Sequence, residues 1–242
     1  MPGSPRLIVS SPSALFPSEP GGETAFLPLV EPVTVRELRE SPRRPGRYLV
    51  VLSTGQTCVV GVETLADTGA TRVGAVLDPV RLERFLYAAV VTGLIDRALN
   101  ALARGRKTRR ELEIRLRRVE PDARVVAAAL DRLEASGVLS DVDVARADAA
   151  ARLRRGEAPA RIRQTLRRKG VDGRGADRAI ADAIEQDGFD ELVACRTQAA
   201  KRWRSLVALE RAVARRRLVG YLQRRGFSGS VVRTVLAELE RG

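Results

Sequence analysis

The chain after Asp96 carries one pattern of apolar residues three times. Three leucines, Leu116, Leu166 and Leu222, serve as reference positions, separated by 50 and 56 residues. Each has an apolar residue four positions before it and apolar residues ten, thirteen and fourteen positions after it. The three later residues form the i, i+3, i+4 stripe of one amphipathic helix, and the two earlier ones belong to the helix before it. A fixed period of this kind is typical of repeat proteins, in which each unit buries its apolar face against its neighbours.

Residues that start and stop helices recur at matching places. Asp122, Asp172 and Ser228 follow the reference leucines by six positions, and each residue type is a preferred helix N-cap. A glycine followed by an apolar residue suits a helix C-terminus, because glycine adopts a positive φ at low cost. These pairs are Gly137-Val138, Gly170-Val171, Gly188-Phe189 and Gly226-Phe227. The first unit has Pro121 where the others have one of these glycines, and proline also ends a helix.

Each unit has room for a leading helix, at residues 98–104, 144–155 and from 192 to 201 or beyond. Thr108 and Glu111 predict a capping box at the start of the helix that follows in the first unit. We therefore predict a mainly α fold, with tandem three-helix repeats in an elongated modular array. The predicted repeats are residues 96–141, 142–188 and 189–242.

Residues 34–95 predict a small β-hairpin with a covering helix. Two β-branched runs, 47–53 and 57–64, flank Thr54-Gly55-Gln56, which is a hairpin signal. An isolated hairpin is marginal in water, so we expect the helix that starts near Asp78-Pro79 to pack on it. Residues 1–33 contain seven prolines, and we expect a disordered, proline-rich tail there. We find no signal peptide and no uninterrupted apolar run of membrane-spanning length.

The composition excludes several kinds of active site. Histidine is absent, which excludes histidine acid–base catalysis, Ser-His-Asp triads and HExxH zinc sites. Cys58 and Cys195 are too few for a Cys₄ zinc site or a disulfide framework, and we expect reduced, buried thiols in a cytoplasmic protein. The glycines of residues 170–175 lack the strand and the GK[ST] ending of a phosphate-binding loop. We therefore expect no enzyme activity, no catalytic residue, no cofactor and no metal.

The positive charge is segregated. Residues 1–95 carry nine basic and nine acidic residues, so the whole formal net charge of +13 lies in residues 96–242. All but three of the 43 basic residues are arginine, whose planar fork suits phosphate and carboxylate groups. The same residues also suit solvated helix faces and helix C-termini, so a single arginine favours neither interpretation. Taken together, the clusters predict a polyanionic partner.

The candidate partner-binding or nucleic-acid-binding residues fall into three clusters, one in each repeat. They are Arg104, Arg106, Lys107, Arg109, Arg110, Arg115 and Arg118; Arg161, Arg163, Arg167, Arg168 and Lys169; and Arg215, Arg216, Arg217, Arg224 and Arg225. Arg117 lies in the first cluster as well, at the expected end of a helix. Aromatic residues that could stack on bases are few, and we expect Trp203, Tyr221 and Phe227 to serve in packing.

Four segments in this order resemble the RecX family of regulators of the RecA recombinase. They are ALNALARGRKTRRELEIRL (98–116), LEASGVLSDVDVARA (133–147), RIRQTLRRKGV (161–171) and RLVGYLQRRGF (217–227). The resemblance covers about residues 80–242, and the proline-rich tail is an addition to it. The sequence departs from the family pattern near Gly156, where Ala158 and Pro159 stand in place of a second glycine.

The resemblance implies a non-enzymatic regulator that binds the RecA filament on single-stranded DNA. Such a regulator lodges in the filament groove and suppresses its ATPase, strand-exchange and coprotease activities, which limits the SOS response. We expect a monomer with direct, nonspecific DNA contacts as well. The alternative is an autonomous DNA-binding protein of helix-turn-helix-like repeats, whose affinity for bare DNA falls steeply as salt rises.

Overall fold

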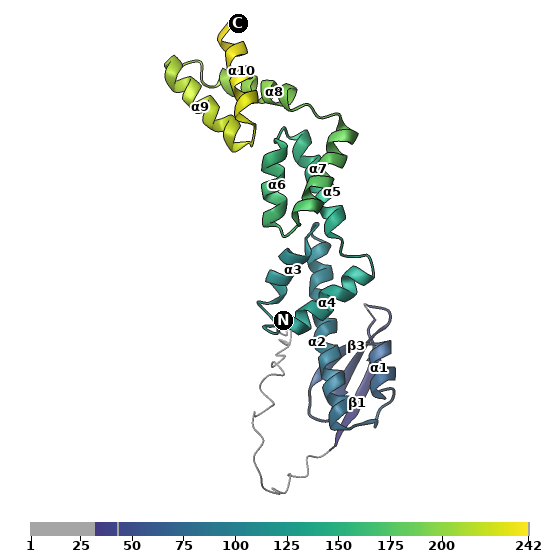
Figure 1. Cartoon of the computed structure of the whole chain (residues 1–242). Helices are drawn as coiled ribbons and strands as arrows, with labels where there is room; N and C mark the ends of the chain where they lie inside the picture. The colour runs from purple at the N-terminus through teal and green to yellow at the C-terminus, as the bar shows by residue number, and fades with distance from the viewer. Residues whose placement is uncertain (1–31, 43, 242) are drawn as a thin grey trace, which may run out of the picture. The chain divides into compact units, whose positions relative to one another are not determined.

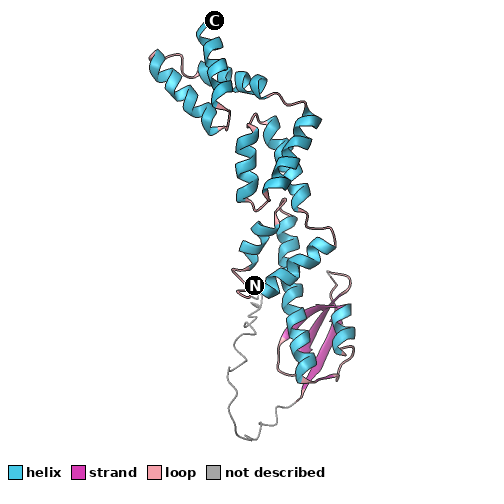
Figure 2. Ribbon diagram, viewed as in Figure 1, coloured by secondary structure: helices cyan, strands magenta, loops and turns pink. Residues whose placement is uncertain are grey.

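The structure is a computed structural model that describes residues 32–42 and 44–241. In this part of the chain it has ten helices and four strands, so the predicted mainly α class is confirmed (Figures 1 and 2). The described residues form two compact units: those up to 104 with 113–136, and 105–112 with 137–241. The predicted tail lies outside the described residues except for its last two positions. Val33 is not part of a tail, because it begins a strand and pairs with Leu77.

The first unit begins with a four-stranded antiparallel sheet of order β3-β2-β1-β4 (Figure 2). The strands are β1 (Val33–Glu40), β2 (Arg47–Leu52), β3 (Thr57–Gly61) and β4 (Val76–Leu77). The predicted hairpin is confirmed as β2 and β3, and Gly55 in its turn has a φ of 83°. Strands β1, which lies between β2 and β4, and β4, which lies at the edge of the sheet, were not expected. The register between β1 and β2 shifts between Val35 and Glu37, which marks a bulge.

Two helices, α1 (Val62–Thr68) and α2 (Pro79–Leu102), pack with this sheet. Asp78 caps α2 by accepting a hydrogen bond from the backbone N–H of Arg81 at 2.8 Å, as the Asp-Pro start predicts. Phe85 is fully buried in the core that includes Val50 and Val60. The helix is continuous across residues 95 and 96, so the predicted boundary between the N-terminal region and the first repeat lies inside it.

Helix α2 is also, among the described residues, the one helix with the length and hydropathy of a membrane span. Its mean hydropathy over the most apolar window is 1.3, and a third of that window is buried. The buried positions, among them Phe85, Val91 and Leu94, face the protein interior, as expected for the core helix of a folded domain.

The remaining helices follow the sequence template. They are α3 (Arg109–Leu116), α4 (Ala123–Ala135), α5 (Asp141–Arg154), α6 (Pro159–Arg168), α7 (Gly173–Asp187), α8 (Glu191–Arg204), α9 (Arg211–Arg224) and α10 (Gly229–Arg241). Every apolar template position is buried, and the side chains of Asp122, Asp172 and Ser228 cap α4, α7 and α10 as predicted. Thr108 and Glu111 form the predicted capping box, each accepting from the backbone N–H of the other.

The second unit contains two three-helix groups (Figure 1). Helices α5, α6 and α7 enclose one core around Ile162, Leu166 and Ile180. Helices α8, α9 and α10 enclose another around Leu218 and Leu222. Each group therefore has its own small apolar core, and Ala158 just before α6 is buried in the core of the α8–α10 group.

Two hydrogen bonds in the second unit join successive repeats. Both use the same two positions relative to the reference leucines. Thr108 lies eight positions before its reference leucine, and its hydroxyl donates to the carbonyl oxygen of Lys169 at 2.5 Å. Ala158 lies at the equivalent position one repeat later, and its backbone N–H donates to the carbonyl oxygen of Arg225 at 3.1 Å. Both accepting residues lie three positions after a reference leucine. The start of α3 thus contacts the end of α6, and the start of α6 contacts the end of α9.

The residue after each accepting carbonyl is a glycine, Gly170 or Gly226. Their φ angles are 95° and 87°, which favour glycine. A Cβ on Gly226 would lie 2.6 Å from the Cβ of Arg161 and 2.7 Å from its backbone nitrogen, and a Cβ on Gly170 would lie 2.5 Å from the Cβ of Arg110. Both the conformation and the close approach therefore require glycine here. We call each pair of carbonyl and glycine, with the helix start it contacts, a glycine junction.

Both cysteines are buried thiols without a disulfide, as predicted. Burial raises the pKa of Cys58 to about 11. Burial also raises the pKa of Cys195 to about 11, helped by the negative charges of Glu191 and Glu238. At pH 8 about one thiol in a thousand is then ionised, and the thiolate is the reactive form.

We predict that Gly226→Ala destabilises the protein more than Gly137→Ala does. Gly137 also has a positive φ, 71°, but no atom lies within 4 Å of the added Cβ, so its cost is the backbone strain of about 1 kcal/mol. Gly226→Ala adds displacement of the Arg161 backbone, for a total of about 3 kcal/mol. Urea unfolding of the two full-length variants measures the difference. Equal losses would show that the close approach at the junction contributes nothing.

We also predict that Ellman's reagent at pH 8 labels neither cysteine quickly in the folded protein. Both thiols should react at least about 100-fold more slowly than free cysteine, because they are buried and nearly un-ionised. In 6 M guanidinium the reagent should titrate two thiols per chain at the rate of free cysteine. Rapid labelling of one thiol in the folded state would contradict the burial of Cys58 or Cys195.

Candidate nucleic-acid and partner interface

Helix α9 concentrates positive charge, and no acidic residue of the helix itself compensates it. It carries five arginines and no acidic residue in 14 positions. Arg211 and Arg215 are directed to the end of α10, where Arg215 pairs with Glu240 at 3.0 Å. Arg216 and Arg217 lie in the middle of α9, where the helix dipole gives a positive charge no particular advantage. The helix dipole therefore does not account for their positions.

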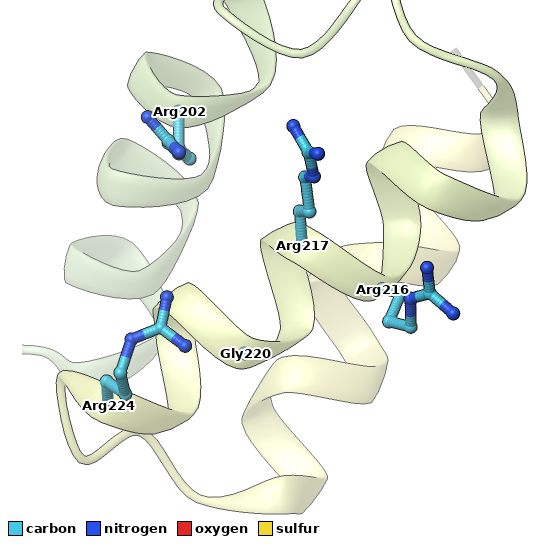
Figure 3. A pocket seen from close by; sticks show the side chains of 5 residues that line it. All are labelled: Arg202, Arg216, Arg217, Gly220 and Arg224. Atoms are coloured by element: carbon cyan, nitrogen blue, oxygen red, sulfur yellow. The ribbon is translucent and has the colours of Figure 1, made fainter.

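Four arginines and one glycine line a hollow between α8 and α9, with a volume of about 440 Å³. Arg202 comes from α8, and Arg216, Arg217, Gly220 and Arg224 come from α9 (Figure 3). We call this site the arginine hollow. Within residues 32–42 and 44–241, no carboxylate pairs with any of its four guanidinium groups. The hollow is therefore a concentrated, uncompensated positive site.

A second hollow, of about 370 Å³, adjoins the glycine junction of the last two repeats. Arg161 and Gln164 of α6 line one side of it, and Gln223, Arg224 and Gly226 line the other. Arg224 belongs to both hollows, so the polar surface continues from α9 to α6 within the second unit.

Tyr221 ties the arginine hollow to the junction. Arg202 lies over its ring at 5.6 Å from the centroid and Arg225 at 5.2 Å, both within cation–π range. Its hydroxyl donates to the side-chain oxygen of Gln198 at 3.1 Å, and the Gln198 amide donates to the carbonyl oxygen of Arg155. Arg225 donates to the same carbonyl at 3.1 Å. The predicted packing role of Tyr221 is thus confirmed, and Trp203 and Phe227 also pack in the core of this repeat.

Three predicted candidates form ion pairs inside the second unit. Arg163 pairs with Asp177, Lys169 pairs with Asp148 at 3.2 Å, and Arg215 pairs with Glu240. Lys169 has a second structural role, because its carbonyl accepts the Thr108 hydroxyl at the junction. These side chains contribute to the packing of helices on one another, and their positive charge is partly compensated.

Other predicted candidates make neutral or backbone contacts. Arg225 binds the carbonyls of Arg155 and Gly156, as part of the junction. The side chains of three others donate hydrogen bonds: Arg161 to Gln164, Arg168 to Thr165, and Lys107 to the carbonyl oxygen of Arg106. The backbone N–H of Arg109 donates to Asp141. All of these partners lie within the second unit.

The remaining candidates have side chains that make no ion pair or hydrogen bond to another described residue. They are Arg104, Arg106, Arg110, Arg115, Arg118, Arg167, Arg216, Arg217 and Arg224. Arg110 packs against the junction at Gly170. The structure brings Arg216, Arg217 and Arg224 together in one hollow, and the other six do not share a hollow with them.

Arg202 is the functional candidate that the sequence analysis missed. It lies on α8, the leading helix of its repeat. The predicted clusters instead lie on or beside the helix that carries the reference leucine. The sequence does contain a signal for it, since Lys201, Arg202 and Arg204 are three basic residues in the last turn of α8. Arg196 on the same helix differs, because it donates two hydrogen bonds of 2.7 Å to Glu238 and lowers the pKa of that carboxyl group.

Comparisons with known proteins identify the family. Residues 190–236, from the residue before α8 into α10, match the family model described as "RecX, third three-helix domain". The regulatory protein RecX of Halorhodospira halophila is 37% identical over 142 residues, which cover 59% of this chain and 85% of that protein. The regulatory protein RecX of Deinococcus radiodurans is 34% identical over 146 residues, covering 60% and 68%.

Two solved structures share the fold. One, described as a crystal structure of regulatory protein RecX, superposes with a TM-score of 0.65 at 21% identity and covers 85% of this chain and 99% of that one. RecX from Lactobacillus salivarius superposes with a TM-score of 0.51 at 21% identity, covering 63% and 98%. With the threefold helical template, its caps and its glycine junctions in place, the sequence relatives establish that this chain belongs to the RecX family of regulatory proteins.

Proposed function

We propose that this protein regulates a RecA recombinase by binding the filament that the recombinase forms on single-stranded DNA. The observation that carries the proposal is the family membership, with 37% identity over 142 residues to a regulatory protein RecX. In this proposal the bound protein inhibits the ATPase, strand-exchange and coprotease activities of the filament and so limits recombinational repair and the SOS response. It acts in the cytoplasm as a monomer, without a catalytic residue, cofactor or metal.

The physical support comes from the repeats and their charge. Units linked in one chain bind a polymer with an avidity that one unit lacks, because after the first contact the others act at high effective concentration. A filament offers repeated binding sites of this kind. A ligand that bridges protomers shifts the filament between states only through its different affinity for those states. We propose that the arginine hollow supplies one of the contacts.

A second candidate function is autonomous DNA binding, and the uncompensated charge of α9 favours it. The two functions predict different relative affinities for bare DNA and for recombinase-coated DNA. An autonomous binder holds bare DNA as tightly as recombinase-coated DNA, whereas a filament regulator prefers the coated form. Affinities for the two forms, measured at one salt concentration, separate the candidates.

We predict that equimolar or lower amounts of the protein inhibit ATP hydrolysis by RecA on single-stranded DNA. The double variant Arg216→Glu/Arg224→Glu should need at least about tenfold more protein for half inhibition, because it reverses two uncompensated charges in the hollow. The control Arg178→Glu reverses an exposed arginine on α7 and should change the midpoint by less than about threefold. Titrations at two salt concentrations measure all three proteins. No inhibition by the unaltered protein would overturn the proposed function.

A further inference from the structure

The floor of the arginine hollow is a glycine in the interior of a helix. Gly220 lies four residues before the end of α9, and glycine is a poorer helix former than alanine at such positions. Its φ is not positive, so its backbone conformation does not require glycine. Glycine inside a helix is also found where another backbone packs closely, but among the described residues an added Cβ would meet one atom within 4 Å. That atom is an Nη of Arg224, at 3.1 Å.

Gly220 therefore leaves space beside the guanidinium group of Arg224. It lies one helical turn after Arg216 and one turn before Arg224, on the same face of α9. A methyl group there would crowd the head of Arg224 and narrow the hollow. Converging like charges are unfavourable without a counter-ion, and no described carboxylate supplies one here. An open floor below unpaired arginines is the arrangement expected of an anion site.

The lining of the hollow distinguishes between kinds of anionic partner. The centre of a protein–protein interface is usually apolar or aromatic, and the arginines that are enriched there lie among such side chains. The arginine hollow is lined by four arginines and a glycine, without an apolar side chain. Protein–nucleic acid interfaces are polar and strongly positive, as this surface is. The lining thus favours phosphate groups over the acidic side chains of a protein.

The length of the site indicates more than one phosphate. Arg216 and Arg224 are two turns apart, which is about 12 Å along the axis of α9. One strand of a duplex carries a charge about every 3.4 Å along the axis, and a single strand can be more extended, so this distance spans at most about four consecutive phosphates. Arg224 also lines the second hollow with Arg161, so the positive track continues towards α6.

We propose that the arginine hollow binds consecutive phosphates of one nucleic acid strand, with Gly220 admitting a phosphate close to the α9 backbone. The forks of Arg216, Arg217 and Arg224 then donate to phosphate oxygens in the bidentate manner that arginine allows. Arg202 completes the site from α8, held by the ring of Tyr221. This inference rests on the proposed function in one respect: it takes the strand to be the DNA of the recombinase filament.

The test measures binding of the full chain to fluorescent oligo-dT, without recombinase, by anisotropy over a range of salt concentrations. Gly220→Ala should fold at least as stably as the unaltered protein, because alanine favours the helix, yet bind at least about fivefold more weakly. The matched control is Gly93→Ala in the interior of α2, where an added Cβ meets no atom within 4 Å. That variant should bind oligo-dT normally. Arg216→Glu should reduce the slope of log affinity against log salt by about 0.7, the value for one phosphate of a single strand.

The possible outcomes are distinct. If Gly220→Ala binds oligo-dT as tightly as the Gly93→Ala control, the phosphate site is refuted. If Gly220→Ala leaves oligo-dT binding unchanged but loses inhibition of RecA, the occupant is a protein surface and the inference is also overturned. If Gly220→Ala weakens oligo-dT binding while the unaltered protein fails to inhibit RecA, the phosphate site stands and the proposed function falls.

Discussion

The glycine junction is the contact on which the order of the helical repeats in the second unit depends. It joins backbone to backbone or to a short hydroxyl, as at Ala158 with Arg225 and at Thr108 with Lys169. A carbonyl at a helix end is an unsatisfied acceptor, and the start of a helix has unsatisfied donors. Each junction satisfies a carbonyl at a helix end, and the junction at Ala158 also satisfies a backbone N–H at a helix start. The joining hydrogen bonds use backbone groups and one hydroxyl, and the side chain of Arg225 adds hydrogen bonds to the carbonyl oxygens of Arg155 and Gly156.

The third repeat departs from the rule at one end. Its position eight before the reference leucine is Ala214, which is buried within α9 instead of standing at a helix start. Helix α9 begins at Arg211, and Glu210 caps it by accepting from the backbone N–H groups of Ala212 and Val213. The additional turn of helix replaces the junction surface. It also lengthens the helix whose middle carries Arg216 and Arg217.

The sequence predicts the helical core well because its signals are local, and it predicts the rest less well because the rest depends on distant partners. Asp122, Asp172 and the glycines act within a few residues of the helix ends they specify. Strand β1 instead pairs with β4, two residues long and more than forty positions away, through Val33 and Leu77. The same limit applies to the site. Arginine clusters were visible in the sequence, but whether Arg163 meets Asp177 or Arg202 meets the α9 arginines depends on how the helices pack.

The repeats differ in how far acidic side chains compensate their arginines, and composition alone does not show this difference. In the α5–α7 group, arginines pair with acids on neighbouring helices, as Arg146 does with Asp182 and Arg154 with Asp187. Such exposed pairs add little stability, but they neutralise the local field. Helix α9 lacks acids, so the positive potential is concentrated at the arginine hollow. Tyr221 connects that hollow to the junction, because Arg202 and Arg225 both lie over its ring and Arg225 donates to the carbonyl oxygen of Arg155.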